Sequence, residues 1–216
     1  MKLAVKICGI KTIEALDAAA TGGARYIGFV FYPPSPRNIA AADAAGLAAR
    51  LPATISKVGL FVDADDVAIA ATLAAFKLDM LQFHGGESPE RVRDVKRRFG
   101  LPVMKAIAVG ARADLDRADL YRDVADWLLF DARPPARPGS LPGGNAVSFD
   151  WTLLTGRRWP LPWMLSGGLT PQNVADAIRI SGAAVVDVSS GVEDRPGVKS
   201  PAKIAAFIAA AKSAGN

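Results

Sequence analysis

Four isolated side chains have types suited to proton transfer or anion binding: Cys8, Arg37, His84 and Asp131. A thiolate is a base or a nucleophile once its pKa falls from about 8.5, and Lys6, on the same side of an extended strand as Cys8, would help to lower it. A carboxyl group is a general acid when burial raises its pKa. A guanidinium in the stiff, proline-bracketed segment YPPSPRN suits bidentate binding of a carboxylate.

Each of these residues also has a simpler interpretation. A lone cysteine is usually a small buried hydrophobe, and an aspartate at a strand end often caps the next turn. Arg37 alone would be an ordinary surface residue, and His84 in QFHGGE is either a proton carrier or an orienting donor. The single histidine has no partners at ligand spacing, so we predict no metal.

Two glycine-containing segments predict a phosphate site. They are SGGLT, with Gly167 and Gly168, and DVSSGV, with Asp187, Ser190 and Gly191. Glycine lets backbone N–H groups approach phosphate oxygens closely, and a helix beginning near Thr170 would add donors and a positive dipole end. The simpler alternative is that these glycines only turn the chain.

Eight short apolar runs must position these residues. They are rich in Val, Ile, Leu and Phe and mostly do not alternate with polar residues, which is typical of parallel strands buried on both faces. The runs are 3–8, 25–31, 55–61, 78–83, 102–107, 126–131, 162–166 and 183–189.

Amphipathic stretches follow these runs and predict helices over 13–23, 39–51, 65–77, 88–100, 114–124, 149–156, 170–182 and 200–212. Ser-Pro or Thr-Pro pairs at 88, 170 and 200 predict helix starts. Strict alternation implies parallel pairing, so we predict an α/β fold, a single-domain (β/α)8 TIM barrel over residues 1–216. The alternative, a doubly wound sheet, lacks its G-x-G-x-x-G fingerprint here.

In such a barrel the site lies where strands end, and all the residues singled out above follow or close a predicted strand. The proline-rich stretch 133–147 follows the sixth strand and is a long loop, a type of segment that is often functional.

Composition narrows the function classes further. The net charge is +5, but the basic residues are scattered and lack interleaved aromatics, so we predict no nucleic-acid partner. No run reaches the roughly 18 apolar residues of a membrane span, and no secretory signal is visible. With one cysteine, the simplest location is a reducing, cytoplasmic compartment.

The strand-end segments resemble, in order, those of the phosphoribosylanthranilate isomerases of tryptophan biosynthesis. The matching segments are KICGIK (6–11), GFVFYPPSPR (28–37), VGLFV (58–62), LQFHG (81–85), FDA (130–132), LSGGLTPQNV (165–174) and DVSSGVED-PGVK (187–199). The family's fold is a (β/α)8 barrel. The resemblance implies no cofactor or metal, an anionic phosphosugar–anthranilate substrate and an Amadori rearrangement, with members that are monomers or homodimers.

Carried over by motif, the resemblance makes Cys8 the general base and Asp131 the general acid. Arg37 would pair with the anthranilate carboxylate, and His84 would lie at the substrate. Phosphate would be bound at Gly168, Ser190 and Gly191, and Asp187 would face the sugar hydroxyls.

Two positions depart from the family pattern. A Gly-Gly-Thr-Gly run, in a loop expected to cover the site, is replaced by residues 143–146, and an Asp after Gly-Val-Lys is Ser200. Other phosphosugar barrels, such as indole-glycerol-phosphate synthase or the tryptophan synthase α chain, match only in the phosphate loops. A catalytically silent phosphosugar-binding barrel is the alternative from a different functional class.

Overall fold

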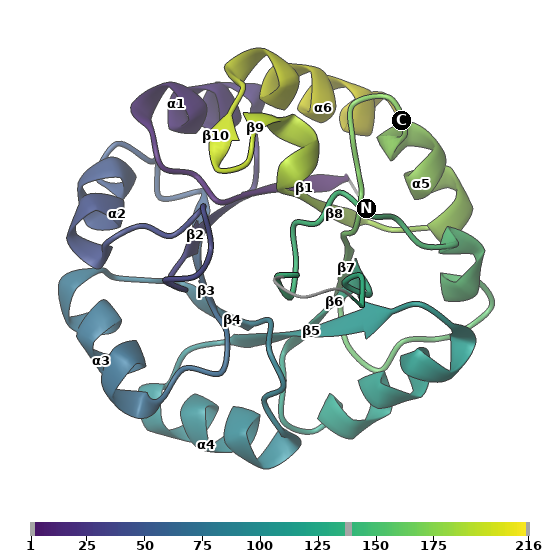
Figure 1. The fold of residues 1–216 in the computed structure, drawn as a ribbon, viewed down its shortest axis with the longest axis horizontal. Helices are drawn as coiled ribbons and strands as arrows, with labels where there is room; N and C mark the ends of the chain where they lie inside the picture. The colour runs from purple at the N-terminus through teal and green to yellow at the C-terminus, as the bar shows by residue number, and fades with distance from the viewer. Residues whose placement is uncertain (1–2, 137–139, 215–216) are drawn as a thin grey trace.

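A closed ring of eight parallel strands forms the centre of the computed structural model, which describes residues 3–136 and 140–214. Each strand pairs with its neighbour in sequence, and the last strand pairs with the first (Figure 1). This confirms the predicted (β/α)8 barrel; that residues 1–216 form a single domain stays a prediction. The strands are β1 (Ala4–Cys8), β2 (Tyr26–Val30), β3 (Ser56–Phe61), β4 (Met80–Phe83), β5 (Val103–Val109), β6 (Trp127–Ala132), β7 (Trp163–Leu165) and β8 (Val185–Val188).

Helices surround the ring in Figure 1 and carry the chain from one strand to the next. The α-helices are α1 (Ile13–Gly22), α2 (Ala41–Ala48), α3 (Asp66–Ala75), α4 (Pro89–Phe99), α5 (Val174–Ser181) and α6 (Pro201–Ala214). Within 3–136 and 140–214, none of the helices is long and apolar enough to cross a membrane.

Two of the predicted helices are 3₁₀ helices instead. The segment predicted over 114–124 is η1 (Arg112–Tyr121), and that over 149–156 is only the single turn η2 (Trp151–Leu154). A short 3₁₀ helix, η3 (Ser190–Val192), and the hairpin β9 (Glu193–Arg195) and β10 (Val198–Lys199) follow β8.

Helix starts follow the capping chemistry at some positions and not at others. The Ser88 hydroxyl accepts a hydrogen bond from the Arg91 N–H at the start of α4, as predicted. The prediction that a helix begins at Thr170 is wrong. The Asn173 side chain accepts the Thr170 N–H and donates to the Gly168 carbonyl, which holds these residues in a turn, and α5 begins only at Val174.

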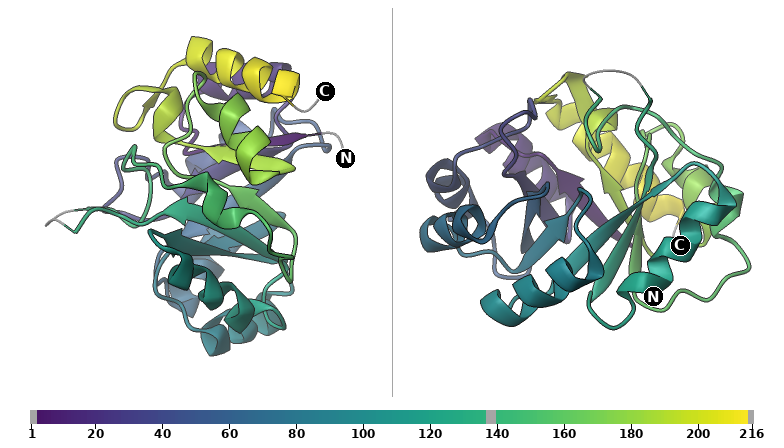
Figure 2. Two further views of the ribbon diagram at one scale, coloured as in Figure 1. Left: turned by 90° about the vertical axis from the view of Figure 1, so that its right-hand side faces the viewer. Right: turned by 60° about the horizontal axis from the view of Figure 1, so that its bottom comes forward.

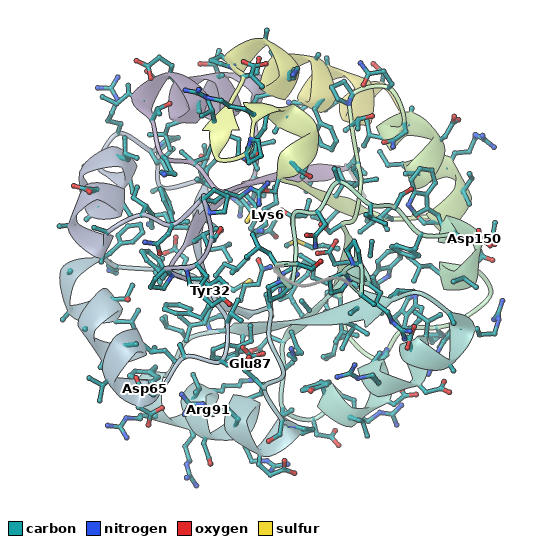
Figure 3. All side chains as sticks on the ribbon, viewed as in Figure 1. Lys6, Tyr32, Asp65, Glu87, Arg91 and Asp150 are labelled. Carbon is teal, nitrogen blue, oxygen red and sulfur yellow. The ribbon has the colours of Figure 1, made fainter. Side chains whose placement is uncertain are left out.

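Apolar side chains fill two separate layers. The larger cluster lies between the strands and the surrounding helices. A smaller cluster, with residues such as Val58, Met104 and Leu129, forms a plug inside the ring toward the amino ends of the strands. Above this plug, the same strands turn polar residues inward, and Figure 3 shows Lys6 inside the ring while Asp65, Arg91 and Asp150 lie around its outside. The barrel is therefore closed by apolar packing at one end and polar at the other.

Candidate active site

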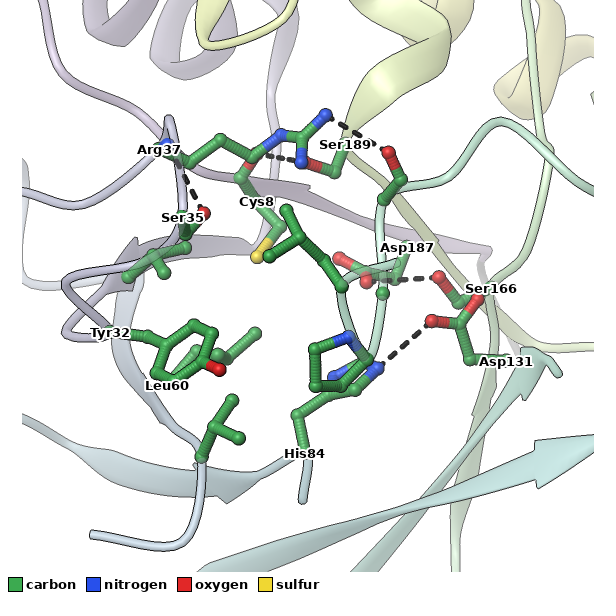
Figure 4. Close-up of a pocket in the computed structure, with 16 residues that line it drawn as sticks. Cys8, Tyr32, Ser35, Arg37, Leu60, His84, Asp131, Ser166, Asp187 and Ser189 are labelled. Atoms are coloured by element: carbon green, nitrogen blue, oxygen red, sulfur yellow. Dashed lines mark hydrogen bonds and ion pairs between the residues drawn. The ribbon is translucent and has the colours of Figure 1, made fainter. Parts of the chain in front are cut away.

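A cavity opens at the carboxyl ends of the strands. It brings together Cys8, Arg37, His84, Asp131 and Asp187, which come from five different strand ends (Figure 4). The sequence placed each of these residues at the mouth of the barrel, and the structure places them around one space. In Figure 2 (left) the loops at this end point away from the side where the two termini lie.

Cys8 ends β1 inside the barrel, next to a buried ion pair. Lys6 is fully buried, and its Nζ lies 2.8 Å from Asp187 Oδ1. Asp187 Oδ2 accepts a hydrogen bond of 3.2 Å from the Ser166 hydroxyl. Asp187 is thus committed to Lys6 and Ser166 while also lining the cavity.

The thiol is less acidic than the sequence suggested. Burial raises the pKa of Cys8 above its usual value, and the ammonium groups of Lys6 and Lys199 offset only part of that increase. The Asp187 carboxylate adds to the rise. Lys6 does lie on the same side of the strand as expected. Its charge acts on the thiol pKa in the predicted direction, lowering it, but the effect of desolvation is larger and leaves the pKa of Cys8 raised.

His84 and Asp131 form a hydrogen-bonded pair on the opposite side of the cavity. His84 Nε2 lies 2.9 Å from Asp131 Oδ2, and Asp131 Oδ1 accepts a 2.9 Å bond from the Ala132 N–H. His84 Nδ1 lies 2.9 Å from Nε2 of Gln82, a fully buried amide on β4. The imidazole is therefore held on both ring nitrogens and orients the carboxyl group.

Arg37 is held in a buried cluster of three charges. Its Nε and Nη2 each lie 2.8 Å from one oxygen of the Glu193 carboxylate, a bidentate pair. Lys199 Nζ lies 2.7 Å from Glu193 Oε1. Both cations hold the pKa of Glu193 below its usual value even though burial alone would raise it. Because two cations share one carboxylate, the cluster keeps a net positive charge at the cavity.

The loop after β6 covers this cavity with its described part. Leu141, Pro142, Gly143 and Gly144 line it, and the Gly144 carbonyl accepts a 3.2 Å bond from Arg37 Nη2. A Cβ on Gly143 would lie 2.7 Å from His84 Nε2, so this close approach requires glycine. Ala146 has a φ of 56°, a left-handed conformation that favours glycine and that coincides with a departure from the family pattern. The rest of the predicted loop, 137–139, lies outside the described residues.

A second cavity lies beside the first, at the loops after β7 and β8 where the sequence predicts a phosphate site. Gly168 and Ser190 line it, whereas Gly191 is not among its lining residues. A Cβ on Gly191 would lie 1.8 Å from the Leu169 carbonyl oxygen, so this glycine lets the loops after β7 and β8 touch. Since α5 begins at Val174, the helix end predicted at Thr170 is absent, and the turn η3 lies next to this cavity instead.

The residues of the site that the sequence did not single out are Gln82, Glu193 and Lys199. Gln82 lies inside an apolar run, and Glu193 reaches Arg37 across 156 positions in sequence. Only the alternation of β4, which turns Gln82 to the same side as His84, offered a signal. Within 3–136 and 140–214, no group of three or more His, Cys, Asp or Glu residues is placed to hold a metal ion.

Comparison with known proteins points to one family. Residues 5–210 match the family model described as N-(5′-phosphoribosyl)anthranilate isomerase. The isomerase of that name from Paramagnetospirillum magneticum is 58% identical over 212 residues, which cover 98% of each chain.

Two solved structures agree with this match. Monomers of the dimeric phosphoribosylanthranilate isomerase of Thermotoga maritima give a TM-score of 0.83 at 37% identity, covering 98% of this chain and 99% of that one. A phosphoribosylanthranilate isomerase in complex with reduced 1-(o-carboxyphenylamino)-1-deoxyribulose 5-phosphate gives 0.84 at 36% identity, with the same coverage.

Proposed function

Since this chain belongs to the N-(5′-phosphoribosyl)anthranilate isomerase family, we propose that Asp131 and Cys8 are its general acid and general base. The chain is an isomerase of tryptophan biosynthesis. Its reaction converts N-(5-phospho-β-D-ribosyl)anthranilate into 1-(2-carboxyphenylamino)-1-deoxy-D-ribulose 5-phosphate. The observation that carries the proposal is that the Asp131 carboxyl group and the Cys8 thiol line the same cavity, next to a second cavity lined by the loops after β7 and β8.

The first step opens the ribose ring. Asp131 gives its proton to the ring oxygen, the bond from that oxygen to C1′ breaks, and its electron pair stays on oxygen. The lone pair of the anthranilate nitrogen forms a double bond to C1′, giving a cationic Schiff base. The two N–H groups on Asp131, from Ala132 and His84, stabilise the carboxylate left behind.

The second step moves the C2′ proton. The Cys8 thiolate takes this proton, the C2′–H electrons form a double bond to C1′, and the Schiff-base electrons return to nitrogen. The resulting enol tautomerises to the ketone. The Schiff base acidifies this C–H bond, so a thiolate is basic enough, and Lys6 and Lys199 place positive charge beside the sulfur.

Substrate binding uses the two positive features of the mouth. Arg37 presents to the anthranilate carboxylate the guanidinium edge that Glu193 leaves free, replacing its contact with the Gly144 carbonyl. The phosphate lies in the second cavity, at Gly168 and Ser190, with Gly191 setting the spacing of the two loops. Asp187, held by Lys6 and Ser166, faces the sugar hydroxyls.

Three variants test these roles. We expect Cys8→Ala and Asp131→Asn each to lower kcat by at least about 10²-fold while binding persists. Arg37→Ala should mainly raise KM. The assay follows the loss of substrate fluorescence, with phosphoribosylanthranilate generated in situ from anthranilate and phosphoribosyl pyrophosphate. Full turnover in a folded Cys8→Ala or Asp131→Asn enzyme removes that residue from its role, and binding without turnover in the parent favours a silent phosphosugar-binding barrel.

We propose further that the reaction needs no cofactor or metal, and that the chain works in the cytoplasm as a monomer or homodimer without nucleic-acid or membrane partners. The helices offer no membrane span over the described ranges, and a dimeric enzyme occurs among the solved relatives. Turnover by chelator-treated enzyme and light scattering at assay concentration test the first and the last of these points.

A further inference from the structure

Gln82 is a buried amide that the mechanism above does not use. It lies on β4, is fully inaccessible to solvent and points into the barrel. Its Nε2 lies 2.9 Å from His84 Nδ1, while its Oε1 has no hydrogen-bond partner among the described residues. A buried carbonyl oxygen without a partner is unfavourable and needs an explanation.

The contact with Gln82 fixes where the imidazole can carry hydrogen. The amide nitrogen of Gln82 can donate a hydrogen bond but cannot accept one, so His84 Nδ1 must be the acceptor. A neutral imidazole with an accepting Nδ1 has its hydrogen on Nε2. Nε2 therefore donates to Asp131 Oδ2 across the 2.9 Å contact.

The same contact opposes a second proton on the ring. An imidazolium carries N–H groups at both nitrogens, so its Nδ1–H would face the amide hydrogens of Gln82. Without Gln82, the proton that acid catalysis needs has two possible sites on the His84–Asp131 pair. It can lie on the imidazole, leaving a carboxylate, or on the carboxyl group, leaving a neutral imidazole.

Only the second arrangement leaves Asp131 with a proton to give. We propose that Gln82 is a positioning residue that keeps the transferable proton on the Asp131 carboxyl group by occupying His84 Nδ1 with an amide N–H. This inference rests on the proposed acid role of Asp131. His84 is the hydrogen-bond partner of the amide, and Oε1 has none among the described residues.

The charged groups around the pair do not fix the ring hydrogen themselves. Asp63 and Arg117 line a third cavity that also contacts His84, and Cys8, Arg37 and Asp187 line the first cavity. The hydrogen bonds of the imidazole ring go to Gln82 and Asp131. The hydrogen on the ring is therefore set by the amide and the carboxyl group.

The test is unusually clean because His84 is the only histidine. In ¹⁵N-labelled enzyme, the imidazole signals report directly which ring nitrogen carries a hydrogen. We expect wild type at neutral pH to show a hydrogen on Nε2 and none on Nδ1. A hydrogen on Nδ1, with or without one on Nε2, overturns the inference without any variant.

Variants add the functional consequence. Gln82→Glu replaces the donor with a carboxylate that accepts from Nδ1–H, so we expect an imidazolium and a loss in kcat of about 10²-fold, the lower end of a general acid's contribution. Gln82→Met removes the bond at similar volume and should mix the two ring tautomers with a smaller loss. Gln172→Glu, the same change at the exposed Gln172, is the matched control and should leave both readouts unchanged.

The outcomes separate this inference from the proposed function. Retained turnover in Asp131→Asn defeats the acid assignment, whatever the spectrum of His84. Loss of turnover in Asp131→Asn, together with wild-type kcat in a folded Gln82→Glu enzyme, defeats the role of Gln82 alone. If Gln82→Glu does not fold, the wild-type spectrum and the Gln82→Met variant still decide the question.

Discussion

A single methyl group added at Gly28 is expected to displace the Cys8 thiol and slow the reaction without unfolding the barrel. Gly28 pairs with Cys8 across β1 and β2, and a Cβ on it would lie 2.8 Å from the Cys8 sulfur. Ordinary contact begins at 3.4 Å, so the thiol must retreat by about 0.6 Å. A misplacement of about 1 Å costs on the order of 10²-fold in rate, and we therefore expect kcat/KM of Gly28→Ala to fall between about tenfold and about 10²-fold.

The fluorescence assay measures this loss, and three controls make it specific. Gly46→Ala adds the same methyl group where no atom lies within 4 Å and should leave kcat/KM unchanged. Urea unfolding should give Gly28→Ala a free energy of unfolding within about 3 kcal/mol of wild type, since overpacking typically costs about 1–3 kcal/mol. In a Cys8→Ala background the Gly28→Ala change should have almost no further effect, because both act through one thiol. A wild-type kcat/KM in folded Gly28→Ala, or losses that multiply in the double variant, would refute the reasoning.

Three further predictions follow from the same mouth of the barrel. Gly191→Ala must separate its loop from the Leu169 carbonyl, which a Cβ would approach to 1.8 Å; we expect weaker competitive inhibition by inorganic phosphate and a free energy of unfolding lower by about 1–3 kcal/mol, whereas unchanged inhibition contradicts the phosphate assignment. Ala146→Gly removes the strain of a left-handed φ of 56° at a residue with a side chain. We expect the free energy of unfolding in urea to stay the same or to rise by up to about 1 kcal/mol, whereas a marked decrease argues against that strain. The rate of Cys8 alkylation by iodoacetamide should keep rising with pH beyond about 8.5, where a free thiol titrates, because burial raises the pKa of the thiol. Lys6→Met should move the midpoint of this pH profile higher still. A wild-type midpoint below that of a free thiol contradicts a pKa raised by burial.

The order of the strands was predictable because a parallel sheet buried on both faces leaves a strong local signal. Each apolar run becomes a strand, and residues after each run gather at one mouth as barrel geometry requires. The crossovers were less predictable. Over 149–156 only the single turn η2 forms, which the Asp150 side chain caps by accepting the Thr152 N–H. Thr170 is tied to Asn173 by a local bond that competes with a helix start.

The supporting residues of the site were invisible in the sequence for a different reason. Glu193 follows a glycine-containing turn and resembles a solvated loop residue, and nothing local indicates that it meets Arg37 and Lys199 in the interior. Gln82 lies within an apolar run as if it were part of the plug. Whether the pKa of Cys8 is raised or lowered also depends on burial. The closed ring desolvates the thiol, and this raises its pKa more than the Lys6 charge lowers it.

The pairing of β1 with β8 has a consequence for how the chain acquires activity during synthesis. The strand that bears Cys8 is made first, but the carboxylate that neutralises Lys6 is Asp187, 181 positions later, and the Ser189 hydroxyl that bonds the Cys8 carbonyl comes later still. Until that last strand leaves the ribosome, the growing chain exposes an open sheet edge and carries an uncompensated ammonium destined for its interior. An unpaired charge there is strongly unfavourable, so a chain that ends before Asp187 should not close its barrel. The ion pair beside Cys8 can therefore form only after β8 has been made.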